Sequence, residues 1–325
     1  MPPSTTSLTA DDFAIFFTDI SKTISSQFST AHTGTQTNNI HCLSTLFFFC
    51  PLTEAVSKLL LSSHPTTCSL EPISPTLSPA LTHINTSLLT GIFPTSFKQA
   101  RETPLLKKPT LNTLLVDSYR PVSLLPFIAK TLEQVVFSQV SLFLSQNNHL
   151  GINQSSSEGA IQLRRHYCQS LKPIPNHQFS FCWIYLPLLT LNHQILLSAL
   201  SSLGITGIPL HWFESYLTGR SFRVVWGGEV SKAHQLVTGV PQGSVLGPLL
   251  FSIYTTSLGS IIQAHVFSHC YADDTKLYLS FQPDDPMVAA WISGCLADIS
   301  AWMKEHHLQL NRAKTEFPCL SDFTA

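Results

Sequence analysis

Apolar residues return every three or four positions in several stretches, which is the pattern of a helix with one buried face. The helix predicted from Thr131 onward has an apolar face made of Leu132, Val135, Val136, Val140 and Phe143. Shorter helices are predicted over 194–203 and 209–217. The clearest helical pattern follows Asp285-Pro286, a suitable helix start, and continues to Met303. The hydrophobic pattern therefore predicts helices in the middle and near the end of the sequence.

Two other stretches place strand-forming residues on both sides of a turn. Residues 222–230 flank Gly227-Gly228 with β-branched and aromatic residues, as in a two-residue β-hairpin. Residues 265–281 do the same around Ala272-Asp273-Asp274-Thr275, so two adjacent aspartates are expected at a hairpin tip. Helices that alternate with antiparallel hairpins, without a glycine-rich nucleotide-binding motif, predict an α+β fold and not a doubly wound one.

Residues 1–90 differ from the rest, because short apolar patches alternate with segments rich in Ser, Thr and Pro, such as 64–67 and 73–75. Proline interrupts a helix because it lacks an amide hydrogen and its ring clashes with the preceding turn. We therefore expect a poorly structured lead-in over 1–90, with no helix longer than a few turns.

The composition supplies enough apolar material for a core but very little charge. Hydrophobic residues make up 44% of the 325 residues, whereas charged residues make up only 11%, against about 25% in a typical protein. The formal net charge is -1, whereas proteins that grip a nucleic-acid backbone usually carry an excess of Lys and Arg. Overall charge therefore argues mildly against tight RNA or DNA binding. Local pairs such as Lys107-Lys108 and Arg164-Arg165 are typical of solvated surface.

Several classes of protein are not favoured by the sequence. The eight cysteines include no C-x-x-C pair and no His partner at zinc-finger spacing, so we expect no zinc site. No secretory signal follows Met1, which predicts an intracellular protein of the nucleus or cytoplasm, not a secreted one, with reduced thiols. The longest apolar stretches, 43–52 and 179–191, are shorter than the roughly 20 residues that cross a bilayer, so no membrane span is expected.

Two motifs carry the candidate chemistry. Asp273 and Asp274 at a tight turn could hold a hard divalent cation, although Asp is also common in turns for structural reasons. About thirty residues earlier, Gly239-Val240-Pro241-Gln242-Gly243-Ser244-Val245-Leu246-Gly247-Pro248 combines glycines and prolines with one amide and one hydroxyl. Such a loop allows the backbone to approach a flat ligand closely.

These two motifs, at this separation, resemble successive motifs of retroelement reverse transcriptases in the palm of a right-hand polymerase. Four further passages are similar to the non-LTR (LINE-type) retrotransposon family, and they are 91–98, 118–124, 192–197 and 311–316. The resemblance covers most of 45–316. It implies fingers and palm over 91–316, with antiparallel palm hairpins, a truncated thumb and a tail over 317–325.

The resemblance also implies partners and residue roles. The family copies an RNA template onto a DNA primer with Mg²⁺, which would be held here by Asp273 and Asp274. Lys314 falls in a palm motif thought to assist the departure of pyrophosphate, and it completes the catalytic set. Four residues are implied to contact nucleotide or template, and they are Arg120, Gln242, Gly243 and Tyr271.

The family's first catalytic aspartate has no counterpart. Its motif reads approximately L-D-L-S-A-A-F-D-T-V-N-H, whereas 183–193 reads W-I-Y-L-P-L-L-T-L-N-H. No Asp or Glu occurs after Glu158 and before Glu214. The resemblance thus implies an RNA-directed DNA polymerase by family that lacks activity and binds Mg²⁺ weakly. Two alternatives stay open, a non-catalytic nucleic-acid-binding remnant and a non-functional translated relic.

A shift of the reading frame accounts for the altered stretch. When the family motif is written in the codons ctg-gat-cta-tct-gcc-gct-ttt-gac-act-gtt and read one nucleotide out of frame, it encodes W-I-Y-L-P-L-L-T-L, which is 183–191. We therefore interpret about 155–191 as out of frame between in-frame flanks. Substitution at the protein level and an error in the gene model are the alternatives. Because Pro187 cannot donate to a sheet ladder, this stretch is expected to disrupt a central palm strand.

Overall fold

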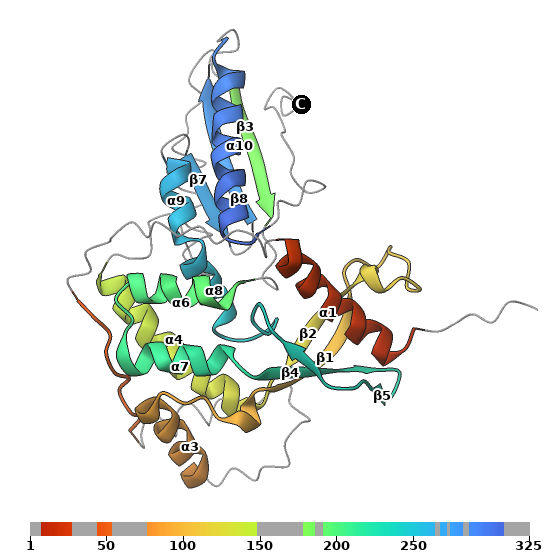
Figure 1. Cartoon of the computed structure of the whole chain (residues 1–325), viewed down its shortest axis with the longest axis vertical. Helices are drawn as coiled ribbons and strands as arrows, with labels where there is room; N and C mark the ends of the chain where they lie inside the picture. Colours follow the sequence, from red (N-terminus) through yellow and green to blue (C-terminus); the bar gives the residue numbers. More distant parts are fainter. Residues whose placement is uncertain are drawn as a thin grey trace, which may run out of the picture. The chain divides into compact units, whose positions relative to one another are not determined.

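The computed structural model of the chain describes residues 8–27, 44–53, 77–147, 178–185, 191–263, 267–271, 274–281 and 286–308. These residues form two compact units, each with its own β-sheet (Figure 1). The first unit contains those up to Phe143 together with 191–247. The second unit contains 144–147, 178–185 and those from Pro248 onward.

The first unit combines helices with a five-stranded sheet. Its helices are α1 (Ala10–Gln27), α3 (Leu77–Thr90), most of α4 (Phe127–Gln146), α6 (His193–Ser202) and α7 (Gly207–Leu217), with short 3-10 helices η1 (Thr95–Phe97) and η2 (Val116–Ser118). Its strands are β1 (Gln99–Leu106), β2 (Tyr119–Leu124), β4 (Arg220–Trp226), β5 (Glu229–Val230) and β6 (His234–Leu236).

The strand order of this sheet is β2-β1-β4-β5, with β6 also paired to β4. β1 is antiparallel to β2 and parallel to β4, while β5 and β6 are both antiparallel to β4. Gly227 and Gly228 connect β4 to β5 with φ angles of 58° and 85°, as in a hairpin turn whose two central residues are left-handed. The predicted Gly-Gly hairpin is therefore confirmed, whereas the sequence did not predict the parallel pair of β1 and β4.

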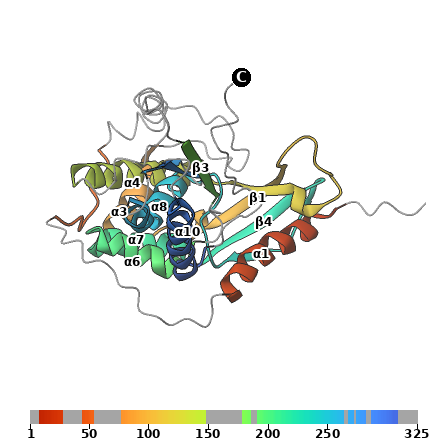
Figure 2. The ribbon, with the colours of Figure 1, turned by 90° about the horizontal axis from the view of Figure 1, so that it is seen from above.

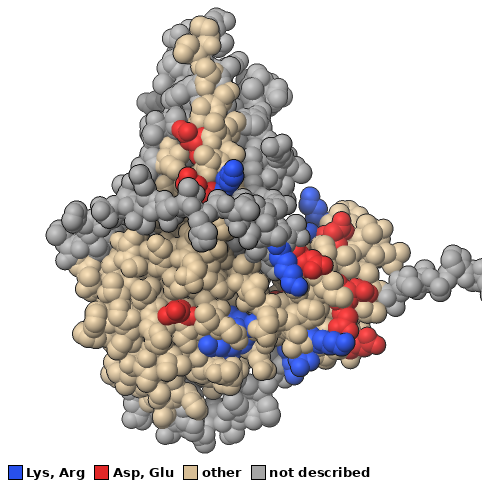
Figure 3. All heavy atoms as spheres, in the orientation of Figure 1, with Lys and Arg blue, Asp and Glu red and all other residues tan. Residues whose placement is uncertain are grey.

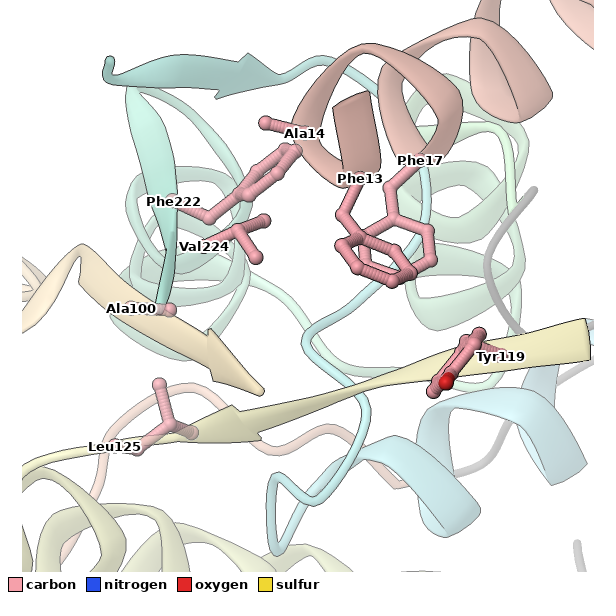
Figure 4. Packing of buried hydrophobic residues seen from close by; sticks show 8 residues of the cluster. All are labelled: Phe13, Ala14, Phe17, Ala100, Tyr119, Leu125, Phe222 and Val224. Carbon is pink, nitrogen blue, oxygen red and sulfur yellow. The ribbon is translucent and has the colours of Figure 1, made fainter. Parts of the chain in front are cut away.

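Helix α1 packs on one face of this sheet (Figure 2). Because side chains alternate along a strand, one face of β1, β2 and β4 supplies the inward residues. Phe13 of α1 contacts Tyr119 edge to face, with 5.0 Å between ring centroids and 76° between ring planes. Figure 4 shows the cluster, which contains Phe13, Ala14, Phe17, Ala100, Tyr119, Leu125, Phe222 and Val224.

The expectation for 1–90 needs correction where the structure describes these residues. No helix longer than a few turns was predicted there, yet α1 has 18 residues and α3 has 14. The N-terminus of α1 is capped reciprocally, since the Asp12 amide donates to Thr9 Oγ1 and the Thr9 amide donates to Asp12 Oδ2. The short apolar patch around Phe13 is sufficient to stabilise α1 because it packs against the sheet.

The helices predicted from apolar periodicity are confirmed. All five residues of the predicted face of α4 are buried, from Leu132 to Phe143. Helices α6 and α7 lie within two residues of the predicted bounds. The apolar face predicted near the end of the sequence belongs to α10 (Val288–Glu305), where Cys295 and Trp302 are among the buried residues.

Within the part of the chain that the structure describes, α4 alone is long and apolar enough to cross a membrane. Of its most apolar window, 56% is buried inside the protein, and the core helix of a soluble protein passes the same test of length and composition. The helix also carries the fully buried carboxylate of Glu133.

The second unit contains a three-stranded antiparallel sheet with the order β3-β8-β7. Its elements are β3 (Gln178–Tyr185), α8 (Gly247–Tyr254), α9 (Thr256–Gln263), β7 (Phe267–Tyr271), β8 (Asp274–Phe281) and α10. β7 and β8 form the predicted hairpin, in which Tyr271 pairs with Asp274. The prediction of mixed helices and antiparallel hairpins is therefore confirmed in its coarse form.

The predicted disruption of a strand by the altered stretch is wrong for 178–185, which form β3. The run that contains Pro187 was expected to disrupt a central strand, yet β3 pairs with β8 along all eight of its residues, Gln178 to Tyr185. It ends two residues before Pro187, which lies outside the described residues. Aromatic and β-branched residues favour strands whatever their origin, and β3 is rich in them.

Candidate nucleic-acid interface and metal site

Two of the sequence motifs meet at the outer edge of β2. The amide of Ser123 in the 118–124 motif donates to the carbonyl oxygen of Gln242 at 2.8 Å. Gly243 has a φ of +103°, and a Cβ atom built on it would lie 3.3 Å from the carbonyl oxygen of Ser123. A side chain at this position would combine an unfavourable backbone conformation with a tight contact. Glycine at 243 thus permits the loop to lie against the strand.

A third motif, 192–197, holds the start of the same loop. The amide of Gly239 donates to the carbonyl oxygen of Leu191 at 2.8 Å, and His193 Nε2 lies 2.8 Å from the carbonyl oxygen of Gly239. Asn192 caps α6, because its Oδ1 accepts from the amides of Gln194 and Ile195. Burial lowers the pKa of His193, while the bond to Gly239 opposes this effect.

The far end of the loop is bound by a buried carboxylate that the sequence analysis missed. Glu133 of α4 is 0% exposed, and its Oε2 accepts from the amides of Val245 at 2.7 Å and Leu246 at 3.4 Å. Its Oε1 accepts from the Tyr216 hydroxyl at 3.3 Å. Burial raises the pKa of Glu133, and the Arg220 charge and these bonds oppose the increase. The sequence signal that could have indicated a buried carboxylate was the position of Glu133 beside Leu132, in an apolar helical face.

Arg220, the second buried charge in this region, was also missed. It is 2% exposed, and its Nε donates to the carbonyl oxygen of Tyr216. Its guanidinium carbon lies 4.1 Å from the ring centroid of Tyr216 and 5.0 Å from that of Phe93, which are distances of cation–π contact. Nη1 and Nη2 are buried and have no hydrogen-bond partner among the described residues. Arg220 therefore supplies a positive charge that favours the ionised form of Glu133.

Arg120 is exposed on β2, where it pairs with Leu105 of β1. Four residues before Leu105, Arg101 pairs directly with Arg223 of β4. Strand alternation therefore places all three arginines on the sheet face that points away from α1. Ten strand residues of β1, β2 and β4 share this face, none of them Asp or Glu, and they are Gln99, Arg101, Thr103, Leu105, Arg120, Val122, Leu124, Ser221, Arg223 and Val225.

Charge elsewhere on the molecule is sparse. In Figure 3 most of the described surface is neither Lys or Arg nor Asp or Glu, in agreement with the 11% charged residues of the sequence. The three arginines on one sheet face are thus a local concentration that the net charge of -1 conceals. We call Arg101, Arg120 and Arg223 the arginine face. Arg101 and Arg223 were not predicted, because their proximity depends on strand register.

The predicted metal site lies at the hairpin of the second unit. Asp274 is the first residue of β8, and its Cα pairs with Tyr271 of β7 on one side and with Tyr185 of β3 on the other. Asp273 and Lys314 lie outside the described residues. Strand β3, which runs beside the Asp-bearing strand, has the sequence QFSFCWIY and contains no carboxylate.

Among the described residues of this sheet, a pair of Mg²⁺ ions would find a carboxylate on β8 alone, that of Asp274. Two such ions, about 4 Å apart, need carboxylates that bridge them from more than one direction. Here the strand paired with β8 supplies none. The described residues also include no group of three or more His, Cys, Asp or Glu side chains that could hold a metal ion.

The sequence matches the family model "Reverse transcriptase (RNA-dependent DNA polymerase)" over residues 106–321, about two thirds of its length. The chain belongs to the reverse transcriptase family. The matched range contains all seven predicted site residues, but it excludes Arg101.

Known relatives of this reverse transcriptase domain come from mobile elements. The chain is 27% identical over 307 residues to the "Probable RNA-directed DNA polymerase from transposon BS" of Drosophila melanogaster, covering 83% of the chain and 32% of that protein. It is 30% identical over 208 residues to the "RNA-directed DNA polymerase from mobile element jockey" of Drosophila funebris, covering 58% of the chain and 22% of that protein. The resemblance to LINE-type reverse transcriptases is confirmed, and the chain spans a third or less of these relatives.

Among solved structures, the domain is similar to apo telomerase from Candida tropicalis truncated from the C-terminal domain. The TM-score is 0.48 with 11% identity, covering 70% of the chain and 51% of the telomerase. It is also similar to an RNA-dependent RNA polymerase of a human picorbirnavirus, with a TM-score of 0.42 and 17% identity, covering 67% of the chain and 42% of that polymerase.

Proposed function

We propose that this chain is a reverse transcriptase domain that retains the family's framework for nucleic acid but does not polymerise DNA. The observation that carries the proposal is the composition of β3. This strand pairs with β8 beside Asp274, yet it contains neither Asp nor Glu.

The chemistry explains why one strand decides activity. Phosphoryl transfer to a primer needs two divalent cations that stabilise the attacking and the leaving oxygen of an in-line displacement. In the family, aspartates at the hairpin and on the neighbouring strand hold both ions. Asp273 and Asp274 alone would leave one side of each ion without a protein carboxylate, so Mg²⁺ binding would be weakened.

The retained framework consists of three motifs joined by hydrogen bonds to the backbone of the 239–248 loop. Ser123 of the first motif bonds to Gln242 of the loop, and His193 of another bonds to Gly239 at the loop's start. These bonds support the proposal that Gln242, Gly243 and Arg120 keep the family's arrangement for contact with the template.

The proposal is tested by a gain of function. The unmodified chain is expected to give no Mg²⁺-dependent primer extension on an RNA template. A chimaera in which 155–191 is replaced by the corresponding block of an active relative should extend the primer. If the chimaera folds and binds template and primer but stays inactive, the missing block is not the cause of inactivity.

The origin of the altered block has a separate test. We propose that 155–191 is translated out of frame, because the shifted family motif reproduces 183–191. Compared with the family's coding sequence, the transcript should therefore carry one change of length near codon 155 and a second near codon 191 that restores the frame. A transcript without such changes of length that still encodes 155–191 as given would favour substitution at the protein level. An unshifted frame that restores the family motif would point to an error in the gene model.

A second candidate function, binding of nucleic acid without chemistry, is favoured by the arginine face. Phosphates release counterions when Lys or Arg neutralise them, so the affinity for a duplex falls as salt rises. Gel-shift titration of an RNA–DNA duplex should show such a fall. Substitution of Arg101, Arg120 and Arg223 by Gln should weaken binding and reduce the salt dependence, whereas a flat response of the unmodified chain would exclude phosphate-dominated contact.

A further inference from the structure

We propose that Glu133 and His193 are positioning residues that hold the 239–248 loop in the conformation in which it meets a nucleic-acid strand. The inference rests on the proposed function of the loop. It goes further by assigning the loop's conformation to two side chains outside it, neither of which was a predicted site residue.

Glu133 fixes the C-terminal end of the loop. One carboxylate oxygen, Oε2, accepts two successive amides, those of Val245 and Leu246. Both partners lie in the 239–248 loop immediately before α8 begins at Gly247. A fully buried carboxylate on a neighbouring helix thus provides acceptors for amides at the start of a helix.

The surroundings of Glu133 hold its carboxyl group in this position. Its Oε1 accepts from the Tyr216 hydroxyl, and the same Tyr216 ring stacks against the guanidinium of Arg220. The positive charge of Arg220 and the bonds from the loop both oppose the increase in the pKa of Glu133 that burial causes.

His193 fixes the N-terminal end of the loop. A bond from Nε2 to the carbonyl oxygen of Gly239 requires a hydrogen on Nε2, which the neutral imidazole can provide. The amide of the same Gly239 donates to Leu191, two residues before His193. Both backbone groups of Gly239 are therefore bound by the segment that begins α6.

Between these ends, the backbone of Gln242 accepts from Ser123, so the loop is held at its start, middle and end. Gly243 stays exposed and Gln242 half-buried. A loop held in this way loses little conformational entropy on binding, which raises its affinity for a strand.

The chain offers matched variants that separate positioning from general stability. Glu133→Met removes the acceptor, while Glu133→Gln keeps an amide oxygen that can accept from Val245 and Leu246. Both remove the carboxyl group that faces Arg220, so effects of this loss on global stability are shared and the difference between the two variants reports the loop. His193→Ala and His193→Gln form the equivalent pair at Gly239, because Gln retains an N–H donor.

The experiment uses the full chain and two readouts. Amide hydrogen exchange should show that Glu133→Met loses protection in 239–247 but keeps it in α7, while Glu133→Gln stays close to wild type. Fluorescence anisotropy with an RNA-template/DNA-primer duplex should show about tenfold weaker binding for Glu133→Met than for Glu133→Gln, since a loop that is not held must be ordered on binding. Tyr216→Phe should reduce loop protection less than Glu133→Met, because it removes the hydroxyl bonds to Oε1 and Ser244 but leaves Oε2 in place for Val245 and Leu246.

Equal loop protection and equal duplex affinity for the members of each pair would overturn the proposal. If Glu133→Met does not fold, the His193 pair decides the question by the same readouts. If the wild-type chain binds no duplex, the proposed function fails, and exchange protection of 239–247 in the variants still shows whether the two side chains hold the loop.

Discussion

The first unit joins separate family motifs through side chains, whereas in the second a strand without a carboxylate pairs with the strand that carries Asp274. In the first, Glu133 and His193 bind opposite ends of the 239–248 loop. In the second, β3 pairs with β8 in full register but has no carboxylate beside Asp274. Strand pairing depends on residue class, which many sequences satisfy. Metal-dependent catalysis depends on one side chain at one position.

The largest effect on stability is expected from Phe13, which joins α1 to the sheet of the first unit. Phe13→Ala should destabilise this unit by about 3–5 kcal/mol, because it removes a fully buried aromatic side chain and leaves a cavity. Ile15 of the same helix is 52% exposed, and Ile15→Ala should cost about 0.5 kcal/mol or less. Urea unfolding of both variants measures the difference. Equal effects would show that α1 does not belong to the core.

A smaller effect, dependent on pH, is expected from Glu102 of β1. This side chain is 5% exposed, its Oε1 accepts from Ser123 Oγ, and its Oε2 has no hydrogen-bond partner among the described residues. Burial raises the pKa of Glu102 to about 7 from 4.5. The folded state thus favours the protonated form. Stability should be highest below pH 4.5, fall as pH rises toward 7, and be lower by about 3 kcal/mol above that range.

The control for this prediction is Glu102→Gln, which mimics the protonated group at all pH values. Urea unfolding between about pH 4 and pH 8 should give similar stabilities at the acidic end and a more stable variant at the basic end. A pH dependence that is identical in the two proteins would contradict the assignment. The comparison also separates Glu102, with one unpartnered oxygen, from Glu133, whose two oxygens are both bonded.

The smallest effects are expected from a pair of glycines, one in each unit. Gly243→Ala should destabilise by about 1–2 kcal/mol, since φ is +103° and the new methyl group would lie 3.3 Å from the Ser123 carbonyl oxygen. Gly259 of α9 has no atom within 4 Å of a built Cβ, so Gly259→Ala should stabilise the helix by about 0.5–1 kcal/mol. Thermal unfolding measures both. A stabilising Gly243→Ala would mean that the loop is not held against β2.

Helices and hairpins could be predicted from the sequence where the evidence is local. The apolar face of α4 and the turn at Gly227-Gly228 depend on residues within one segment, and both are confirmed. The parallel pair of β1 and β4 could not be predicted in this way, because it joins residues more than a hundred positions apart. Likewise, the apolar patch around Phe13 becomes a core only when the sheet covers it.

In the candidate site, too, local motifs could be predicted from the sequence, whereas burial and contacts between distant segments could not. Motifs identified the loop with Gln242 and Gly243, and the structure brings that loop to Ser123 in the motif of Arg120. Glu133 and Arg220 were missed because charged residues are expected at the surface, and their burial follows from tertiary packing. The missing carboxylate of β3 was visible in the sequence alone, since an absence over 159–213 needs no fold.

The most direct test of the account is a primer-extension assay of the unmodified, folded chain on an RNA template with Mg²⁺. We predict no extension above that of a chain in which Asp274→Asn removes a hairpin aspartate. The chimaera with the restored 155–191 block should extend the primer and lose this activity when Asp274→Asn is added. Mg²⁺-dependent extension by the unmodified chain that Asp274→Asn abolishes would contradict the account, because catalysis would then proceed without a carboxylate on β3.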